Sequence, residues 1–499
     1  MTLQDTPAND HTVDAIVIGL GPGGEEVASR LARGGWSVLA VETHLVGGEC
    51  PYYGCIPSKM MLHESRRPGA SWPRVARRIR EEATDDWDDA VAVERLTGTG
   101  ARFVRGRAEV SGGPGGAPAP DGTGVTVTPD DGGPPQAWTA RRAVVLNTGS
   151  EAVRIPVPGL PEAVAWTHRD VVTAEELPAS LAVVGGGPLG CELAQALAGF
   201  GVRVTMLIRG DRLLPGETEE AGQLVAGRFR DDGIEVRTGT EITGVVSGEV
   251  SRYEANHGLP TPAGPVDLEL STGDRITVDR VLLATGRSPR DDVRVDDWCR
   301  VLDGAGEPVA GRFAVGDMTG AGPFTHTSMA QAAVVAGQLL GQGDARPFPR
   351  DAVPRVTYTD PEVAAVGLSE RAARDGAGDG ARDGAGEATA GRDTVRVARV
   401  DLASSSRGWI DEVSGHLTLV ARGGGPEGVP VGEAGGGECT AQVLVGASVV
   451  GPQAGEILGA LTVAVHARVP VAELARIPWA YPTLHRAIGD ALGQLGTEA

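Results

Sequence analysis

The pattern that most constrains the fold occurs twice in the chain: an apolar strand, a glycine loop, a helix and a second strand. The first copy predicts a strand at Val13 to Leu20, the loop Gly19-Leu20-Gly21-Pro22-Gly23-Gly24, a helix at Glu25 to Arg33 and a strand at Trp36 to Val41. Gly19, Gly21 and Gly24 let the backbone approach a pyrophosphate at a helix N-terminus. Glu42, 23 residues after Gly19, can bind a pair of ribose hydroxyls. The segment therefore predicts a complete dinucleotide-binding unit.

The second copy differs at the acidic position. It predicts a strand at Leu181 to Val184, the loop Gly185-Gly186-Gly187-Pro188-Leu189-Gly190, a helix at Cys191 to Gly199 and a strand at Val202 to Ile208. Gly185, Gly187 and Gly190 repeat the three glycines, but Ile208 replaces the acid. Arg209 follows, with Arg203 and Arg212 nearby. A missing acid beside arginines suits a 2′-phosphate, which favours NADPH over NADH. The alternative is that these arginines are solvated surface residues.

A cysteine pair follows the first copy. Cys50 and Cys55 lie in Gly47-Gly48-Glu49-Cys50-Pro51-Tyr52-Tyr53-Gly54-Cys55-Ile56-Pro57-Ser58-Lys59. Lys59 is the only lysine among 45 basic residues, and its compact ammonium does chemistry that a guanidinium cannot. Pro57 suits a first helical turn, which places Cys55 just outside the N-terminus of a helix that runs to Glu64. The helix dipole there favours a thiolate.

The cysteine pair has three interpretations. A redox disulfide is the first. Half a zinc site is the second, although structural zinc needs four ligands and Cys191, Cys299 and Cys439 are scattered. Two inert cysteines are the third. Since the pair directly follows the first nucleotide unit, flavin is the natural cofactor of that unit, because it accepts a hydride and passes two electrons to sulfur.

Composition restricts the class of protein. A chain of 499 residues predicts two to four domains. No stretch of 18 apolar residues occurs, and the polar segment Met1 to Thr12 lacks the features of a signal peptide. Five cysteines do not form an extracellular disulfide framework, so we expect a cytoplasmic protein. The net charge of −21 argues against binding to nucleic acid or to an anionic membrane.

Three segments rich in glycine are predicted as flexible surface loops without helix or strand: residues 111–135, 372–393 and 423–437. Around them, the last third alternates strand-like runs with a helix at Ala454 to His466. The runs are Val395 to Val400, Leu417 to Val420 and Ala441 to Val450. This pattern predicts an α+β domain that is distinct from the two parallel-sheet units.

Together these motifs resemble the class I pyridine nucleotide–disulfide oxidoreductases, the group of glutathione reductase, dihydrolipoamide dehydrogenase and mercuric reductase. The motifs are the two glycine loops, the cysteine segment, Asn147-Thr148-Gly149-Ser150, Ala284-Thr285-Gly286-Arg287, Phe313-Ala314-Val315-Gly316-Asp317 and Tyr358-Thr359-Asp360-Pro361-Glu362-Val363. The resemblance implies an α/β fold with Rossmann-like FAD and NADPH domains and a C-terminal α+β dimerisation domain. The implied boundaries are 1–153 and 285–348 for FAD, 154–284 for NAD(P)H and 349–499 for dimerisation.

The resemblance also implies roles for single residues. Cys50 attacks the substrate, and Cys55 faces the flavin as a thiolate. Lys59 lies near flavin N5 and pairs with Glu192; the alternative is that Glu192 is a surface helix residue. The other residues expected at the cofactors are Gly48, Thr148, Gly149, Gly286, Gly316, Asp317 at the ribityl–phosphate region, and Pro323 to His326 along the isoalloxazine.

The C-terminal segment departs from the family pattern. Members that reduce disulfides usually carry a His-Pro-Thr segment and a glutamate five residues after the histidine. Here Tyr481 and Arg486 take these two places, which is similar to the tyrosine of mercuric reductases, although their C-terminal cysteine pair is absent. His485 is predicted as a solvated helix residue or a displaced base. Tyrosine is a poor base at neutral pH but a competent hydrogen-bond donor.

We therefore predict an FAD-dependent NADPH oxidoreductase with a redox-active Cys50–Cys55 disulfide and a disulfide-type or unusual acceptor. Two alternatives stay open. One is an NAD(P)H:quinone or dye reductase whose electrons leave directly from flavin. The other is a non-turnover flavoprotein subunit or redox sensor. The resemblance implies a homodimer with an active site built across subunits.

Overall fold

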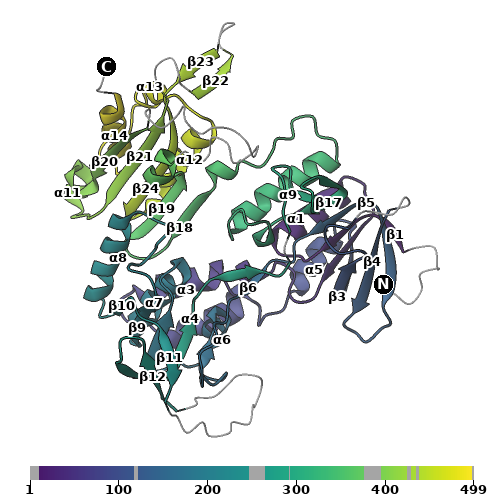
Figure 1. Cartoon of the computed structure of the whole chain (residues 1–499), viewed down its shortest axis with the longest axis horizontal. Coiled ribbons are helices and arrows are strands. Elements are labelled where there is room, and N and C mark those ends of the chain that lie inside the picture. Colours follow the sequence, from purple (N-terminus) through teal and green to yellow (C-terminus); the bar gives the residue numbers. More distant parts are fainter. Residues whose placement is uncertain are drawn as a thin grey trace. The chain divides into compact units, whose positions relative to one another are not determined.

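The computed structural model of the protein describes residues 11–116, 122–246, 264–291, 293–375, 395–423, 429–433 and 438–496 (Figure 1). The chain forms two compact units. Unit 1 comprises Met1–Ile155, Trp166–Leu177 and Thr285–Phe348. Unit 2 comprises Pro156–Ala165, Pro178–Ala284 and Pro349–Ala499.

A seven-stranded sheet forms the centre of unit 1. Its strands are β1 (Thr12–Ile18), β2 (Val38–Glu42), β3 (Arg102–Val110), β4 (Thr123–Pro129), β5 (Gln136–Leu146), β16 (Arg300–Leu302) and β17 (Pro308–Ala314). The strands β3, β2, β1, β5 and β17 run parallel in that order, while β4 bridges β3 and β5 in antiparallel fashion. The parallel strands are apolar because both of their faces are covered.

The strand β4 corrects one expectation from the sequence, because residues 111–135 were predicted to contain no strand. Val125 and Val127 are buried, whereas Thr126 and Thr128, which alternate with them, are exposed. This alternation has the period of two that a half-buried strand requires. The glycines and prolines around it hid the signal.

Two helices of unit 1 pack closely, α1 (Pro22–Arg33) and α9 (Thr325–Leu339). A Cβ at Gly23 would lie 2.2 Å from the Ser328 Oγ, so only glycine permits this approach. The helix α1 begins at Pro22, earlier than predicted, because proline suits the first helical position.

The other elements of unit 1 are α2 (Glu49–Tyr52), α3 (Cys55–Ser65), α4 (Trp72–Arg78), η2 (Ile79–Ala83), α5 (Ala90–Thr97), β6 (Ser150–Ala152), α6 (His168–Thr173), β15 (Arg287–Pro289) and η3 (Asp317–Thr319).

The second nucleotide-binding copy forms a parallel sheet in unit 2. Its strands lie in the order β10 (Glu235–Thr238), β9 (Arg203–Ile208), β8 (Ser180–Val184) and β14 (Arg280–Leu283). The helices are α7 (Pro188–Gly199) and α8 (Glu219–Asp231), and a small antiparallel sheet follows with β11 (Ile242–Val245), β12 (Val266–Leu270) and β13 (Arg275–Val278). The short β7 (Ala165–Trp166) adds a fifth strand to the larger sheet, beside β14.

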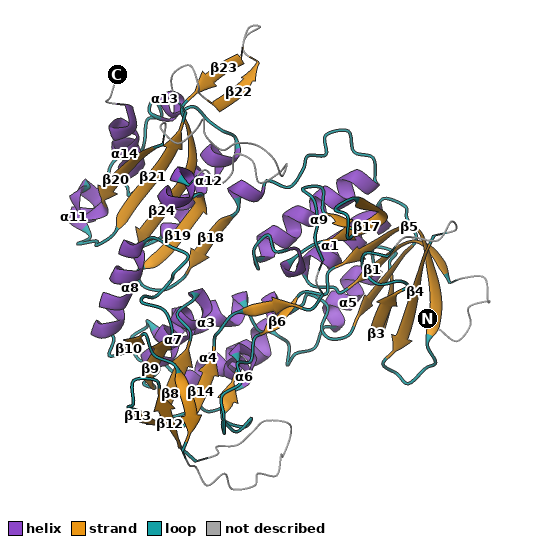
Figure 2. Cartoon of the chain, viewed as in Figure 1, coloured by secondary structure: helices purple, strands orange, loops and turns teal. Residues whose placement is uncertain are grey.

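The last third of the chain is an antiparallel sheet with helices on one face (Figure 2). The strand order is β18 (Pro354–Thr357), β19 (Glu362–Gly367), β24 (Val443–Gly451), β21 (His416–Arg422) and β20 (Arg396–Asp401). The helices α12 (Ala454–His466), α13 (Val471–Leu474) and α14 (Arg486–Gly496) share its main core. The remaining elements are η4 (Arg350–Ala352), α10 (Glu370–Arg374), η6 (Leu402–Ser404) and α11 (Ser406–Ile410).

Two further loop predictions were partly wrong. β22 (Val429–Glu433) lies inside the segment 423–437 and pairs with β23 (Glu438–Ala441), which begins directly after it. The helix α10 extends into the segment 372–393, because the Ser369 hydroxyl accepts a hydrogen bond from Ala372 N and caps it. Residues 376–394 lie outside the described part of the chain. Among the described helices, none is both long and apolar enough to cross a membrane.

Candidate dithiol and dinucleotide sites

Two short helices of unit 1 position the cysteine pair. Cys50 lies in α2, and Cys55 is the first residue of α3, whose N-cap is Gly54. The sequence predicted Cys55 just outside the helix, so its position is one residue further inside. Both cysteines are free thiols and are hydrogen-bonded to each other.

The two thiols differ in acidity. The hydrogen bond from Cys50 is the largest cause that lowers the pKa of Cys55, to about 6; burial opposes it, while the Thr325 hydroxyl and the Lys59 charge assist. Thr325 Oγ1 lies 3.5 Å from Cys55 Sγ. The same hydrogen bond, together with burial, raises the pKa of Cys50. At neutral pH the pair therefore holds a thiolate at Cys55 and a proton-donating thiol at Cys50.

A polar cluster beside the thiol loop was not predicted from the sequence. Glu49 Oε2 lies 3.0 Å from His168 Nε2, and Arg169 Nε donates to Glu49 Oε1 at 3.0 Å. Arg287 Nη2 lies 3.9 Å from Glu49 Oε1, and its Nε lies 3.8 Å from Asp317 Oδ2. The only signal in the sequence was a carboxylate directly before Cys50, at a helix N-terminus where negative charge is favoured.

The first glycine loop has no room for side chains, so its backbone is bare. Gly19 has φ +87°, and a Cβ at Gly24 would lie 2.0 Å from the Gly19 carbonyl oxygen. A Cβ at Gly48, which has φ +69°, would lie 2.9 Å from the Gly21 Cα. The loop thus has the bare backbone that a pyrophosphate at the N-terminus of α1 requires. These residues fit the phosphate region of FAD.

Glu42 stands at the end of β2, beside this loop. Its Oε2 accepts a hydrogen bond from Leu20 N at 2.6 Å, and its Oε1 accepts one from His44 N at 2.8 Å. The two backbone donors fix the carboxylate and leave further lone pairs for ribose hydroxyls.

The remaining predicted flavin residues also lie in unit 1. Thr148 Oγ1 donates to Asp291 Oδ2, and the carbonyl of Gly149 accepts from Arg290 N at 3.2 Å. Ser150 Oγ donates to Asp317 Oδ2 at the start of η3. Gly286 and Gly316 both have positive φ, +114° and +83°, next to Arg287 and Asp317. His326 is exposed near the start of α9 and stacks on Phe324 with ring centroids 5.3 Å apart.

The second glycine loop repeats the geometry of the first. Gly185 has φ +114°, Gly187 is the extended N-cap of α7, and a Cβ at Gly190 would lie 2.6 Å from the Gly185 carbonyl oxygen. Pro188 opens α7 as Pro22 opens α1. The two copies therefore share one local structure, as the sequence predicted.

The three arginines considered for a 2′-phosphate have different surroundings. Arg209 follows β9 with 87% of its side chain exposed, and its Nε lies 3.9 Å from Glu241 Oε1. Arg212 donates instead to the carbonyls of Leu214, Pro215, Glu217 and Thr218. Arg203 begins β9, at the end of the strand opposite to the glycine loop, whereas nucleotides bind beyond the carboxyl ends of parallel strands.

Glu192 is not a surface residue, because it is 3% exposed within α7. Its Oε1 accepts a hydrogen bond from Tyr358 N at 2.9 Å. A buried carboxylate needs such partners. Pairing of Glu192 with Lys59, whose Nζ donates to Ser58 Oγ at 3.2 Å, stays a prediction. The neighbouring Cys191 is fully buried, which raises its pKa and makes it unreactive.

The C-terminal segment presents Tyr481 to solvent. Tyr481 is 72% exposed, and its hydroxyl donates to Ser406 Oγ at 3.0 Å. Arg486 Nε lies 3.3 Å from Asp490 Oδ1 within α14. His485 was predicted as a helix residue, but α14 begins one residue later. Tyr481 and Arg486 thus have separate partners and do not reproduce a His–Glu pair.

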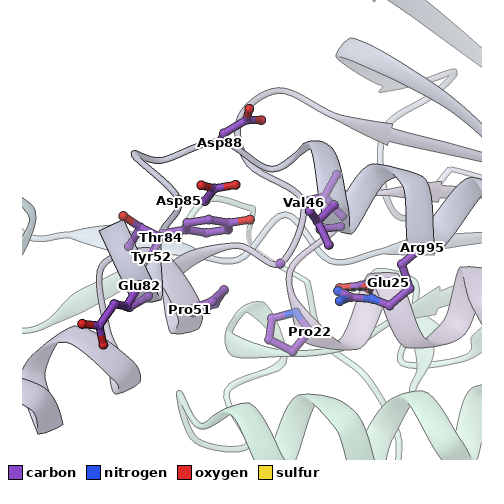
Figure 3. Close-up of a pocket in the computed structure, with 14 residues that line it drawn as sticks. Pro22, Glu25, Val46, Pro51, Tyr52, Glu82, Thr84, Asp85, Asp88 and Arg95 are labelled. Carbon is purple, nitrogen blue, oxygen red and sulfur yellow. Dashed lines mark hydrogen bonds and ion pairs between the residues drawn. The ribbon is translucent and has the colours of Figure 1, made fainter. Parts of the chain in front are cut away.

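A cavity of about 390 Å³ lies beside α2 (Figure 3). Pro51 and Tyr52 of α2 line it together with residues of α1, η2 and α5. In Figure 3, Arg95 lies against Glu25, with Nη2 2.6 Å from Oε1. Neither cysteine lines this cavity, so we do not assign it to the thiol chemistry.

Comparison with known proteins identifies the family. Residues 13–336 match the pyridine nucleotide-disulphide oxidoreductase family, and residues 438–492 match the dimerisation domain of that family. The chain therefore belongs to the pyridine nucleotide-disulphide oxidoreductases. Membership confirms the predicted fold class and makes the protein an FAD-dependent flavoprotein with NAD(P)H-dependent disulfide oxidoreductase activity. The dimerisation domain supports a homodimer.

Individual relatives match over nearly the full length. A dihydrolipoyl dehydrogenase of Thermus scotoductus is 31% identical over 98% of this chain and 98% of its own. A glutathione reductase of Burkholderia cepacia is 27% identical over 95% and 97%. The fold is shared with LpdA of Mycobacterium tuberculosis (TM-score 0.75, 24% identity, 97% and 100% covered). It is also shared with the Cu(II) complex of the HOCl-induced flavoprotein disulfide reductase RclA of Escherichia coli (TM-score 0.74, 21% identity, 97% and 99% covered).

Proposed function

We propose that the protein passes electrons from NADPH through FAD to the Cys50–Cys55 pair, and from Cys50 to a disulfide-type acceptor. The observation that carries this proposal is the pair of free, hydrogen-bonded thiols Cys50 and Cys55, because their hydrogen bond lowers the pKa of Cys55 and raises that of Cys50. Bound FAD supplies a carrier that takes a hydride and returns two electrons to sulfur.

The residues at the thiol pair have separate roles in the reaction. Lys59 and Thr325 stabilise the Cys55 thiolate. The Cys50 sulfur attacks the acceptor disulfide, which breaks the acceptor S–S bond and forms a mixed disulfide, and the proton of Cys50 passes to the acceptor sulfur that leaves. Cys55 then attacks Cys50, which re-forms the Cys50–Cys55 disulfide and releases the reduced acceptor as a thiolate.

The cofactors are held by the two glycine loops. Gly19, Gly21, Gly24 and Gly48 border the FAD pyrophosphate, and Glu42 takes ribose hydroxyls. Gly185, Gly187 and Gly190 border the pyrophosphate of the nicotinamide nucleotide. Arg209, exposed beyond the carboxyl end of β9, reads a 2′-phosphate and favours NADPH.

The test is a panel of acceptors under NADPH, followed through the nicotinamide absorbance. The panel contains small disulfides, quinones and Hg(II), and the Cys50→Ser variant is measured beside the native protein. We expect turnover of at least one disulfide-type acceptor that Cys50→Ser abolishes. Full turnover by Cys50→Ser with every acceptor would contradict the proposal, and no NADPH oxidation at all would favour a non-turnover redox sensor.

A second function, reduction of quinones or dyes directly from flavin, is favoured by one observation. Tyr481 and Arg486 are bound to Ser406 and Asp490, so no imidazole–carboxylate pair stands where the family's disulfide reductases carry one. Quinone reduction needs no such proton donor for a leaving thiolate. Quinone turnover that persists in Cys50→Ser would identify this function.

A further inference from the structure

The carboxylate of Glu49 has partners on both of its oxygens. Oε2 lies 3.0 Å from His168 Nε2, and Oε1 accepts from Arg169 Nε at 3.0 Å and also from Arg169 Nη2. Arg287 Nη2 lies 3.9 Å from the same Oε1. His168 is 6% exposed, so this is a partly buried ionic cluster rather than a solvated surface pair. Such clusters are much less screened than surface ion pairs.

The cluster holds both ends of the helix that contains Cys50. Glu49 is the first residue of α2, Tyr53 is its C-cap, and Cys50 follows Glu49 directly. The Arg169 guanidinium contacts Glu49 and also lies over the Tyr53 ring, 4.6 Å from its centroid. A helix of four residues is not stable by itself, and α2 has no side-chain cap. Contacts with His168 and Arg169 of α6 therefore fix the position of Cys50.

Glu49 is also the charge that balances the cations around this helix. Burial alone would raise the pKa of Glu49, but the hydrogen bonds from His168 and Arg169 and their charges outweigh burial and lower it to about 2. The carboxylate is thus ionised at neutral pH. The charged and titratable groups that face the loop are Arg169 and His168 of α6, Arg287 of β15, Asp317 of η3, Lys59 of α3 and His44.

The cluster continues to the predicted flavin residue. Arg287 Nε donates to Ser150 Oγ at 2.8 Å, and the Ser150 hydroxyl donates in turn to Asp317. A continuous set of polar contacts therefore joins the residue before Cys50 to the residue predicted to hold the ribityl–phosphate region.

We propose that Glu49 is a positioning residue for Cys50, which fixes α2 on α6 and balances the positive charge of Arg169 and Arg287 at the N-terminus of that helix. The inference deepens the proposed function, on which it rests. Without the carboxylate, Arg169 loses its ionic partner at the residue before Cys50 while Arg287 keeps Asp317, and the more positive surroundings favour the Cys50 thiolate. A disulfide whose reduced form is stabilised in this way is easier to reduce, so the reduced pair becomes a weaker electron donor.

The experiment compares Cys55→Ser with Glu49→Gln/Cys55→Ser in the flavin-containing, full-length protein. The rate at which iodoacetamide alkylates Cys50 is measured against pH by mass spectrometry of the Cys50 peptide. We expect Glu49→Gln to shift the profile to lower pH by about one unit, the lower end of the effect of a nearby charge. In the Cys55-containing protein, the equilibrium with glutathione should move toward the dithiol, by about tenfold at a pH at which Cys50 is ionised.

Three further variants separate electrostatics from folding. Glu26→Gln removes another carboxylate of unit 1 that pairs with an arginine, Arg30, at 2.6 Å, and should leave the profile unchanged. Glu49→Asp keeps the charge, so its pH profile of Cys50 alkylation should stay within a few tenths of a pH unit of the Cys55→Ser profile, on the scale of weak surface effects. Arg169→Gln removes a cation and should shift the profile to higher pH, which keeps the proposal testable if Glu49→Gln does not fold.

An unchanged or upward-shifted profile in Glu49→Gln overturns the proposal, even if the variant melts at a lower temperature. A lower melting temperature alone would indicate a purely structural role. The outcome is independent of the acceptor panel, because alkylation needs no turnover. If Cys50→Ser retains full turnover while Glu49→Gln shifts the profile, the proposed function fails and the role of Glu49 stands.

Discussion

Arg312 is an unusual charge in the interior of unit 1. It lies in β17 opposite Val144 and is 1% exposed. Its Nε and Nη1 atoms have no hydrogen-bond partner among the described residues, and burial lowers the pKa of its guanidinium. A buried cation with unsatisfied donors costs free energy, and its replacement by an apolar side chain of similar volume is often stabilising.

We expect Arg312→Met to stabilise the protein by about 1–2 kcal/mol, within the range measured for apolar replacement of buried charges. Thermal unfolding measures this as a higher melting temperature. The control is Arg141→Met, since Arg141 is half-exposed on β5 and pairs with Asp14 at 3.1 Å. That control should change stability by less than about 1 kcal/mol. A clear loss of stability in Arg312→Met would show instead that the guanidinium makes a stabilising interaction in the interior of unit 1.

The acidity of Cys55 gives a second prediction at the residue scale. Because its pKa is lowered to about 6, the thiolate is present above pH 6 and is lost as the pH falls below it. In Cys50→Ser, a long-wavelength charge-transfer band should appear without reductant and rise with pH, with a midpoint above about 6 because the hydrogen bond from the Cys50 thiol is lost. Spectral titration measures it. Thr325→Val removes an assisting hydrogen bond and should move the midpoint upward, while Cys55→Ser should show no band.

The thiol loop also shows how far single residues can be predicted from sequence. Cys50, Cys55 and Lys59 carry their chemistry within one short motif, so their roles could be proposed directly. The partners of Glu49 lie 119 and 120 positions later in the chain, and no periodicity links them. The surroundings of Glu192 likewise depend on a distant segment, because its hydrogen-bond partner Tyr358 lies much later in the chain. Such contacts appear only when distant segments are folded together.

Elements were predicted well where a local pattern sets them. The two glycine loops share positive φ at Gly19 and Gly185 and a proline at the first helical position, and sequence alone specifies both features. The strand β4 was missed because its alternation spans seven residues among turn-forming residues. It pairs with β3 and β5 on either side, and this pairing, rather than propensity, stabilises it.

The strand β9 supports a prediction about the nicotinamide nucleotide. Arg209→Ala should weaken NADPH binding by about 1–3 kcal/mol, the scale of a charge-assisted hydrogen bond, and barely change NADH binding. Arg203→Ala is the matched control, because Arg203 lies at the opposite end of the same strand. Titration of each nucleotide into each variant gives the dissociation constants. Equal losses for NADPH and NADH would show that Arg209 does not contact the 2′-phosphate.

At the scale of the whole molecule, the exposed aromatic residues of unit 2 suit a homodimer. Tyr481 is 72% exposed and Trp409 is 78% exposed, and the Tyr481 hydroxyl donates to Ser406 in the same short helix as Trp409. Exposed apolar side chains on neighbouring segments are typical of an interaction surface. The sequence places Tyr481 and Arg486 where the family's disulfide reductases carry a histidine and a glutamate. General acid–base catalysis of that kind contributes about 10²–10⁴ in rate.

We therefore expect slow native turnover of simple disulfides, together with comparatively fast turnover of quinones. The double substitution Tyr481→His/Arg486→Glu should raise disulfide turnover and leave quinone turnover nearly unchanged. Steady-state rates with both acceptors test this. The single Arg486→Glu variant is the control, since it lacks the imidazole and should not gain activity. Rapid native reduction of a simple disulfide would instead indicate another proton donor, with His485 the first candidate.

The gain in disulfide turnover expected for Tyr481→His/Arg486→Glu can also test whether each active site uses residues of both subunits. One chain carries Cys50→Ser with Tyr481→His/Arg486→Glu, and the other is native; two different tags allow the mixed dimer to be purified. The first chain alone has no nucleophile, and the native chain alone is slow. If the C-terminal segment of one subunit serves the thiols of the other, the mixed dimer combines native Cys50 with the introduced histidine in one of its two sites. Its disulfide turnover should then exceed that of both parent homodimers. A mixed dimer no faster than the mean of its parents would place the thiols and residue 481 of the same chain in one site.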